Sequence, residues 1–157
     1  MNHKNNFQIS KMSRHLKHLS VIVFSLILGS CTNQDTTTPA SIDSSISKIE
    51  VLDFHSTHRC MTCNAIEANT KYTLNTYFSN ELKDDKITFK VINIDEEENE
   101  SIAEKFEASG TSLILNVINK GKETQINLTD FAFMKGNDKE AFSTELKAKI
   151  DSELKNL

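Results

Sequence analysis

Residues 49–63 read IEVLDFHSTHRCMTC, and the fold prediction starts from this segment. Its first six residues are mostly apolar or branched, which is typical of a short β-strand. Residues 60–82 contain no glycine or proline, and their apolar side chains recur on one helical face. The sequence therefore predicts a strand, a loop and then a long helix that begins at Cys60 and Cys63.

The two cysteines are spaced for dithiol chemistry. Unpaired amides and the dipole at a helix N-terminus favour negative charge, so the Cys60 thiolate should form more readily than that of a free cysteine, whose pKa is about 8.5. Arg59 adds a positive charge beside it. Cys63 lies one turn further in, where it can attack a mixed disulfide and release the product. We expect Cys60 to be the attacking and Cys63 the resolving cysteine, while the direction of the redox reaction stays open.

The rest of the chain predicts an alternating α/β order. Gly110 follows the second predicted helix as a stop signal, and Asn137 and Glu140 are placed to form a capping box on the last one. The remaining predicted elements are a strand over 87–94, a helix over 99–108, strands over 112–118 and 124–128 joined by a turn over 119–122, and a helix over 138–154. The resulting order is β-α-β-α-β-β-α. It predicts a mixed four-stranded sheet flanked by helices.

From about residue 49 to residue 157 the chain resembles the thioredoxin family, with the strand before CxxC, VINID over 91–95 and the glycine turn in corresponding places. The resemblance implies a minimal thioredoxin-like fold and a buried carboxylate that takes a proton from the second cysteine. Asp53 matches that carboxylate, with Glu67 as a substitute, while Ser112 stands where the family places a cis-proline. Residues 54–70 are also similar to small thioredoxin-like proteins described as subunits of a nitrophenyl-compound nitroreductase.

Three functions compete for the cysteine pair. The first is a thiol–disulfide oxidoreductase or electron-transfer partner, which needs no cofactor. The second is a metal-binding or metal-delivery module, in which His55 and His58 join Cys60 and Cys63 in a His₂Cys₂ set suited to zinc or copper. The third is a redox-inert docking subunit that holds a partner beside Ser112.

Several other residues have two interpretations. Asp53 is either a proton relay or a strand-end residue paired with a lysine, and Glu67 is otherwise a solvated helix residue. The acidic run over 95–98 either resembles a cation site or complements a helix dipole. Three apolar residues after the hairpin either line a binding groove or form a satellite of the core: Phe131, Phe133 and Met134.

Residues 1–30 indicate a targeting segment. Four basic residues precede an apolar run over 19–28 that is too short for a permanent membrane span. The sequence LGSC over 28–31 resembles the lipobox of bacterial lipoproteins, which implies lipidation of Cys31. We therefore expect a signal peptide over 1–30, a flexible tether over 31–47 and one domain over 48–157, with translation starting at Met1 or Met12. This predicts an envelope protein that faces the periplasm, with the choice of inner or outer membrane open.

The net charge of the chain limits which classes of partner are expected. The chain has 18 basic and 22 acidic residues, and the predicted signal peptide contains four of the basic ones and no acidic one. Its removal leaves a net charge of −8, which repels phosphate backbones. The sequence therefore excludes nucleic acid as an expected partner and favours protein thiols or disulfides, or an envelope reductase.

Overall fold

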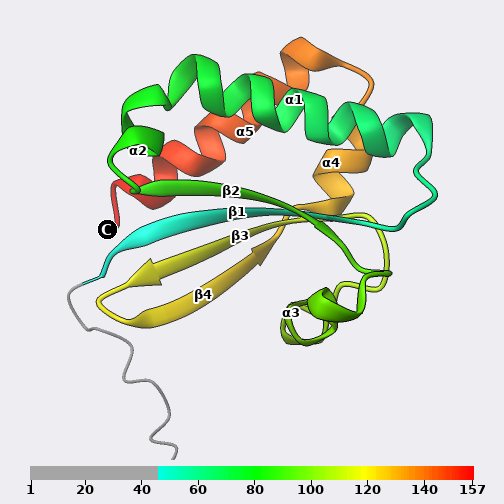
Figure 1. Ribbon diagram of the computed structural model, residues 1–157. Helices are drawn as coiled ribbons and strands as arrows, with labels where there is room; N and C mark the ends of the chain where they lie inside the picture. The colour runs from blue at the N-terminus through cyan, green and yellow to red at the C-terminus, as the bar shows by residue number, and fades with distance from the viewer. Residues whose placement is uncertain (1–45) are drawn as a thin grey trace, which may run out of the picture. The chain divides into compact units, whose positions relative to one another are not determined.

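The computed structural model describes residues 46–157, which form a mixed sheet with helices on both faces (Figure 1). The strands are β1 (Lys48–His55), β2 (Ile87–Asn93), β3 (Ser112–Asn119) and β4 (Lys122–Asn127). The helices are α1 (Met61–Tyr77), α2 (Ser79–Lys83), α3 (Glu100–Lys105), α4 (Thr129–Lys135) and α5 (Lys139–Leu154), with a 3₁₀ turn, η1 (Glu97–Asn99). The order in the sheet is β2-β1-β3-β4, with β1 parallel to β2 and the other pairs antiparallel. This confirms the minimal thioredoxin-like α/β fold.

Side chains that alternate along β1 contribute to two apolar cores. Ile49 and Val51 join a large apolar cluster with residues of α1, α4 and α5, whereas Leu52 and Phe54 join a smaller cluster next to α3. Figure 1 shows α1 and α5 on one side of the sheet and α3 on the other. Asp53 has the same parity as Ile49 and Val51, so it points towards α1.

The helix predicted over 60–82 is broken at Phe78. This residue ends α1 with φ −130° and ψ 29°, and its side chain is buried in the large cluster. The backbone leaves the helical region here, and α2 follows as a separate short helix. A buried aromatic anchor at the end of α1 thus divides what the sequence pattern presents as one helix.

Three further details of the helices differ from what the sequence predicts. Between the hairpin and the last helix lies α4, which was not predicted. The helix expected over 99–108 is the shorter α3, preceded by η1. The N-cap of α5 is Asp138, whose Oδ1 accepts the N–H of Ala141 at 3.0 Å. Because Ala141 rather than Glu140 occupies the third helical position, no capping box forms.

The predicted hairpin turn is confirmed. Asn119 pairs with Lys122 across the β3–β4 ladder, which leaves Lys120 and Gly121 as a two-residue loop. Their φ angles are 50° and 78°. Two successive positive φ values match the twist of the flanking strands, and glycine adopts this conformation without steric cost.

Some sequence predictions lie outside the described residues. These are the signal peptide over 1–30, the lipidation of Cys31 and most of the tether over 31–47. Within residues 46–157, every helix is too short or too polar to traverse a bilayer.

Candidate active site

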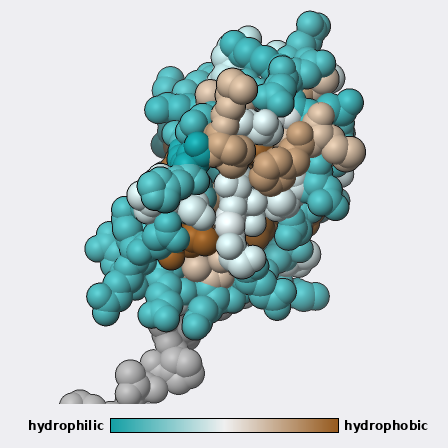
Figure 2. Space-filling view, turned by 90° about the vertical axis from the view of Figure 1, so that its right-hand side faces the viewer, coloured by the Kyte–Doolittle hydropathy of each residue, from teal (hydrophilic) through white to brown (hydrophobic). Residues whose placement is uncertain are grey.

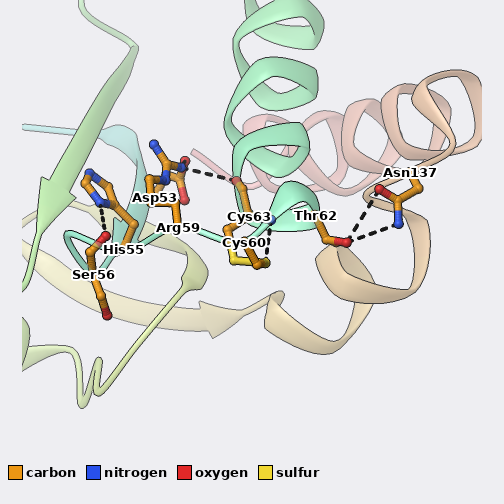
Figure 3. Close-up of a disulfide and its surroundings, with 8 residues drawn as sticks. All are labelled: Asp53, His55, Ser56, Arg59, Cys60, Thr62, Cys63 and Asn137. Atoms are coloured by element: carbon orange, nitrogen blue, oxygen red, sulfur yellow. Dashed lines mark hydrogen bonds and ion pairs between the residues drawn. A yellow bond between two sulfur atoms is a disulfide. The ribbon is translucent and has the colours of Figure 1, made fainter.

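Cys60 and Cys63 form a disulfide at the beginning of α1 (Figure 3). Their Cα atoms are 5.0 Å apart, and Cys60 is the N-cap of the helix. The Cys60 sulfur accepts the N–H of Cys63 at 3.0 Å. Cys60 is exposed, whereas Cys63 is buried. An incoming thiol therefore meets Cys60 first, and a thiolate formed there is stabilised by a helix N-terminus.

Asp53 is the buried carboxylate of the site. Its side chain is 0% exposed, and neither carboxylate oxygen has a hydrogen-bond partner among the described residues. Burial raises the pKa of Asp53 to about 7, an effect that Arg59 opposes and Glu67 reinforces. The carboxyl group is therefore poised to gain or lose a proton near neutral pH.

Arg59 connects the disulfide to two carboxylates. Its Nη2 donates to the carbonyl of Cys63 at 3.2 Å and lies 3.8 Å from Asp53 Oδ2. Its Nη1 donates to Glu67. Asp53 is thus paired with an arginine rather than with the lysine considered from the sequence. Glu67 remains partly exposed, so Asp53 is the better match for a buried carboxylate.

His55, the first of the two histidines before Cys60, lies apart from the sulfurs. His55 Nδ1 is 2.9 Å from the carbonyl oxygen of Ser56, and Figure 3 shows this ring away from the disulfide. Among residues 46–157, no three His, Cys, Asp or Glu side chains are grouped so as to hold a metal ion. The structure therefore does not bring the proposed His₂Cys₂ set together.

The loop before Cys60 is attached to the end of β2. Asp95 accepts the N–H of Thr57 at 2.7 Å, and Asn93 Nδ2 donates to Thr57 Oγ1 at 3.2 Å. The Thr57 hydrogen bonds are the main reason why the pKa of Asp95 is lowered, and His58 and His55 add to the effect. Asp95 therefore anchors the loop, a role that was not predicted from the acidic run over 95–98.

The CxxC dipeptide is attached on its other side to the segment between α4 and α5. Asn137 Nδ2 donates to Thr62 Oγ1 at 3.1 Å, and Asn69 Nδ2 donates to the Gly136 carbonyl at 2.8 Å. A Cβ on Gly136 would lie 2.8 Å from the Ala132 carbonyl oxygen and 3.0 Å from Thr62 Cγ2. Only glycine permits this close approach, so Gly136 is a second site residue that was not predicted from the sequence.

Apolar side chains are exposed between the cysteines and near the end of α4. Met61, between the cysteines, is 84% exposed, and Met134 near the end of α4 is 75% exposed. Figure 2 views the end of the molecule at which α1 begins and shows apolar atoms gathered within a hydrophilic surround. Phe131 belongs to the large core, whereas Phe133 and Met134 are exposed. The interpretation of these three residues as one satellite of the core was therefore wrong.

Ser112 lies at the same end of the sheet as the disulfide. It is the first residue of β3 and pairs with Phe54 near the end of β1. Its Oγ donates to the Gly110 carbonyl at 3.4 Å, and its side chain is half-buried. The role implied for this position by the family resemblance stays a prediction.

No family model and no curated protein matches the chain. Among solved structures, it is similar to a thioredoxin of Fasciola hepatica, with 19% identity, a TM-score of 0.42 and coverage of 68% of this chain and 81% of the other. It is also similar to the oxidized form of mitochondrial thioredoxin 3 from Saccharomyces cerevisiae, with 20% identity, a TM-score of 0.38 and coverage of 59% and 79%. A third match is a malarial protein, with 19% identity, a TM-score of 0.36 and coverage of 56% and 94%. At these values the similarities carry no information on activity.

Proposed function

We propose that the protein is a thiol–disulfide oxidoreductase that cycles Cys60 and Cys63 between dithiol and disulfide. One observation carries the proposal: an exposed Cys60 caps the first turn of α1, with a bonded, buried Cys63 and the buried carboxylate of Asp53 on the same side of the sheet. This arrangement supports Cys60 as the attacking residue, Cys63 as the resolving residue and Asp53 as the proton acceptor.

The exchange proceeds in two steps. The Cys60 thiolate attacks one sulfur of a partner disulfide, a bond forms between these sulfurs, and the second partner sulfur leaves as a thiolate. Cys63 then loses its proton and attacks Cys60 Sγ, which releases the first partner sulfur and restores the Cys60–Cys63 disulfide. Two electrons pass from the cysteine pair to the partner. The reverse sequence oxidises a partner dithiol.

Asp53 is the proposed acceptor of the Cys63 proton. A general base works best when its pKa lies near the working pH, and burial brings the pKa of Asp53 to about 7. Thiol exchange should therefore depend on pH through this carboxyl group as well as through the Cys60 thiol.

Serine substitutions of the two cysteines test the function. Cys60→Ser should abolish reduction of a chromogenic aromatic disulfide by the dithiol-treated protein. Cys63→Ser should retain one attack and accumulate a mixed disulfide on Cys60, detectable by intact mass. Both variants remove the same disulfide, so each is the control for the other. Full activity of Cys60→Ser would end the proposal.

The reduction potential distinguishes turnover from a static bridge. Known oxidoreductase pairs lie between about −270 and −120 mV, and structural disulfides lie below about −300 mV. We expect a value in the first range, measured by equilibration with glutathione. A value in the second range would favour the redox-inert docking subunit.

We further propose that the chain acts at the bacterial cell envelope, anchored through a lipid on Cys31 and facing the periplasm. The basic N-terminus, the apolar run over 19–28 and the LGSC sequence support this location. Protein thiols or disulfides, or an envelope reductase, are the proposed partners. The resemblance to nitroreductase subunits makes such a reductase the first partner to test. Cys31→Ala should abolish incorporation of labelled fatty acid, and labelling of this variant at the wild-type level would contradict the anchor.

A further inference from the structure

The Arg59 guanidinium lies between two carboxylates of unequal exposure. It is 3.8 Å from Asp53, which is fully buried, and hydrogen-bonded to Glu67, whose side chain is 29% exposed. A third contact, to the Cys63 carbonyl at 3.2 Å, fixes the guanidinium against the first turn of α1. One cation is therefore shared between an inner and an outer carboxylate.

The other groups around Asp53 are uncharged. Its register partners in β2 and β3 are Val91 and Leu113. The core on this side of the sheet receives apolar side chains from α4 and α5: Phe131, Ala132, Phe142, Leu146 and Ile150. From α1, Glu67 acts on Asp53, and the electrostatic effects on Asp53 come from Arg59 and Glu67 with opposite signs. Any charge regulation of Asp53 therefore runs through this pair.

Resting on the proposed exchange function, we propose that Arg59 is a positioning residue that keeps the Asp53 carboxylate able to ionise near the disulfide, and that Glu67 moderates it by drawing on the same guanidinium. Arginine stays protonated and transfers no proton itself. Its effect is electrostatic: it stabilises the carboxylate that accepts the Cys63 proton. Too strong an ion pair between Arg59 and Asp53 would make Asp53 a weak base. The competing bond from Arg59 to Glu67 weakens that ion pair.

The proposal predicts opposite effects of two substitutions on one titration. In the disulfide form, the carboxyl carbon of Asp53 is followed by NMR, with an expected midpoint at about pH 7 in the wild type. Arg59→Met should raise this midpoint by about 1 pH unit or more, because a nearby opposite charge lowers the pKa of an acid by about that amount. Glu67→Gln should lower the midpoint, because it removes a negative charge and frees the guanidinium. Arg59→Lys, which keeps the charge without the planar fork, should lie between Arg59→Met and the wild type.

Lys105→Met is the matched control. It removes a cation whose partner, Glu123, belongs to another part of the surface, and it should leave the Asp53 midpoint unchanged. A merely structural role of Arg59 would lower the melting temperature without moving the midpoint in opposite directions for Arg59→Met and Glu67→Gln. If Arg59→Met does not fold, the sign of the shift in Glu67→Gln decides.

Equal midpoints, or shifts of the same sign in both variants, would overturn the proposal. The titration is made on the disulfide form and needs no turnover. It therefore succeeds or fails separately from the activity of Cys60→Ser, which tests the exchange function.

Discussion

Two clusters of polar side chains lie on opposite faces of β1, and each contains one carboxylate of the strand. The two carboxylates are three residues apart, and their pKa values are shifted in opposite directions. The first, here the Glu50 cluster, consists of Lys48, Glu50 and Asn116. The second, the Asp53 cluster, consists of Asp53, Arg59 and Glu67. Glu50 accepts from Asn116 at 3.0 Å and pairs with Lys48 at 2.8 Å. Within residues 46–157, Asp53 accepts no hydrogen bond, and it lies 3.8 Å from Arg59.

The pKa values follow from these contacts. Burial is the largest single effect on Glu50 and raises its pKa. The hydrogen bonds from Lys48 and Asn116 and the positive charges of Lys48 and Lys90 together outweigh it, so the pKa is lowered. For Asp53, burial dominates, and the attraction of Arg59 is too weak to reverse it. Hydrogen-bond donors and positive charges thus favour the ionised form of Glu50, whereas burial without donors favours the protonated form of Asp53.

Asp53→Asn should produce the largest change. The pKa of Asp53 rises from 3.8 to about 7 in the folded protein, so the native state loses stability as the pH rises from 3.8 to about 7. At 1.36 kcal/mol per pH unit this cost is about 4 kcal/mol above pH 7. The neutral asparagine avoids it, so the variant should be more stable than the wild type by about that amount near pH 8.5 and nearly equal below pH 4.

The same variant should exchange thiols more slowly, by roughly a hundredfold near neutral pH, because general-base help is lost. Denaturant unfolding of the disulfide form across pH measures the first effect, and reduction of a chromogenic disulfide measures the second. Parallel stability curves for the two proteins across this pH range would show that Asp53 titrates normally.

Glu50→Gln should act in the opposite direction and more weakly. The lowered pKa of Glu50 means that its charge stabilises the fold above the ordinary value of 4.5, and this stability is lost as the pH falls through the lowered pKa. The variant should therefore be less stable by about 1 kcal/mol at neutral pH and equal to the wild type in acid. Its thiol exchange rate should match that of the wild type. A slower rate would mean that the Glu50 cluster also serves the disulfide.

The sequence was most informative where the structure is local. The strand over 49–54, the helix beginning at the cysteines and the Lys120-Gly121 turn each depend on neighbouring residues, and all three were predicted correctly. The alternation of side chains along β1 places Glu50 and Asp53 on opposite faces of the sheet. The cysteine pair was predictable from its spacing and from the helix that begins there.

The contacts that position the disulfide were not predictable because they join distant parts of the chain. Thr57 and Asp95 are 38 residues apart, and Thr62 and Asn137 are 75 apart. Asn137 looked like a helix cap because its local pattern fits one, but it bonds to Thr62, and Asp138 takes the cap. Tertiary contact decided between two acceptable local roles.

Asp95→Asn extends the comparison to a carboxylate that is bonded but exposed, and its effect should be the smallest. Asp95 accepts the Thr57 N–H at 2.7 Å, and this bond, foremost among its causes, lowers the pKa of the carboxyl group. Asparagine keeps an acceptor oxygen but loses the charge, and water screens an exposed charge in either case. The melting temperature at neutral pH should therefore fall by less than it does in Glu50→Gln.

The loss should be confined to the loop before Cys60. Hydrogen exchange of the Thr57 amide should become faster, while amides in the middle of β1 keep the wild-type protection. If Asp95→Asn destabilises the fold more than Glu50→Gln, then burial does not determine how much each carboxylate contributes to stability. The contrast between Glu50 and Asp53 would in that case reflect their number of hydrogen bonds alone.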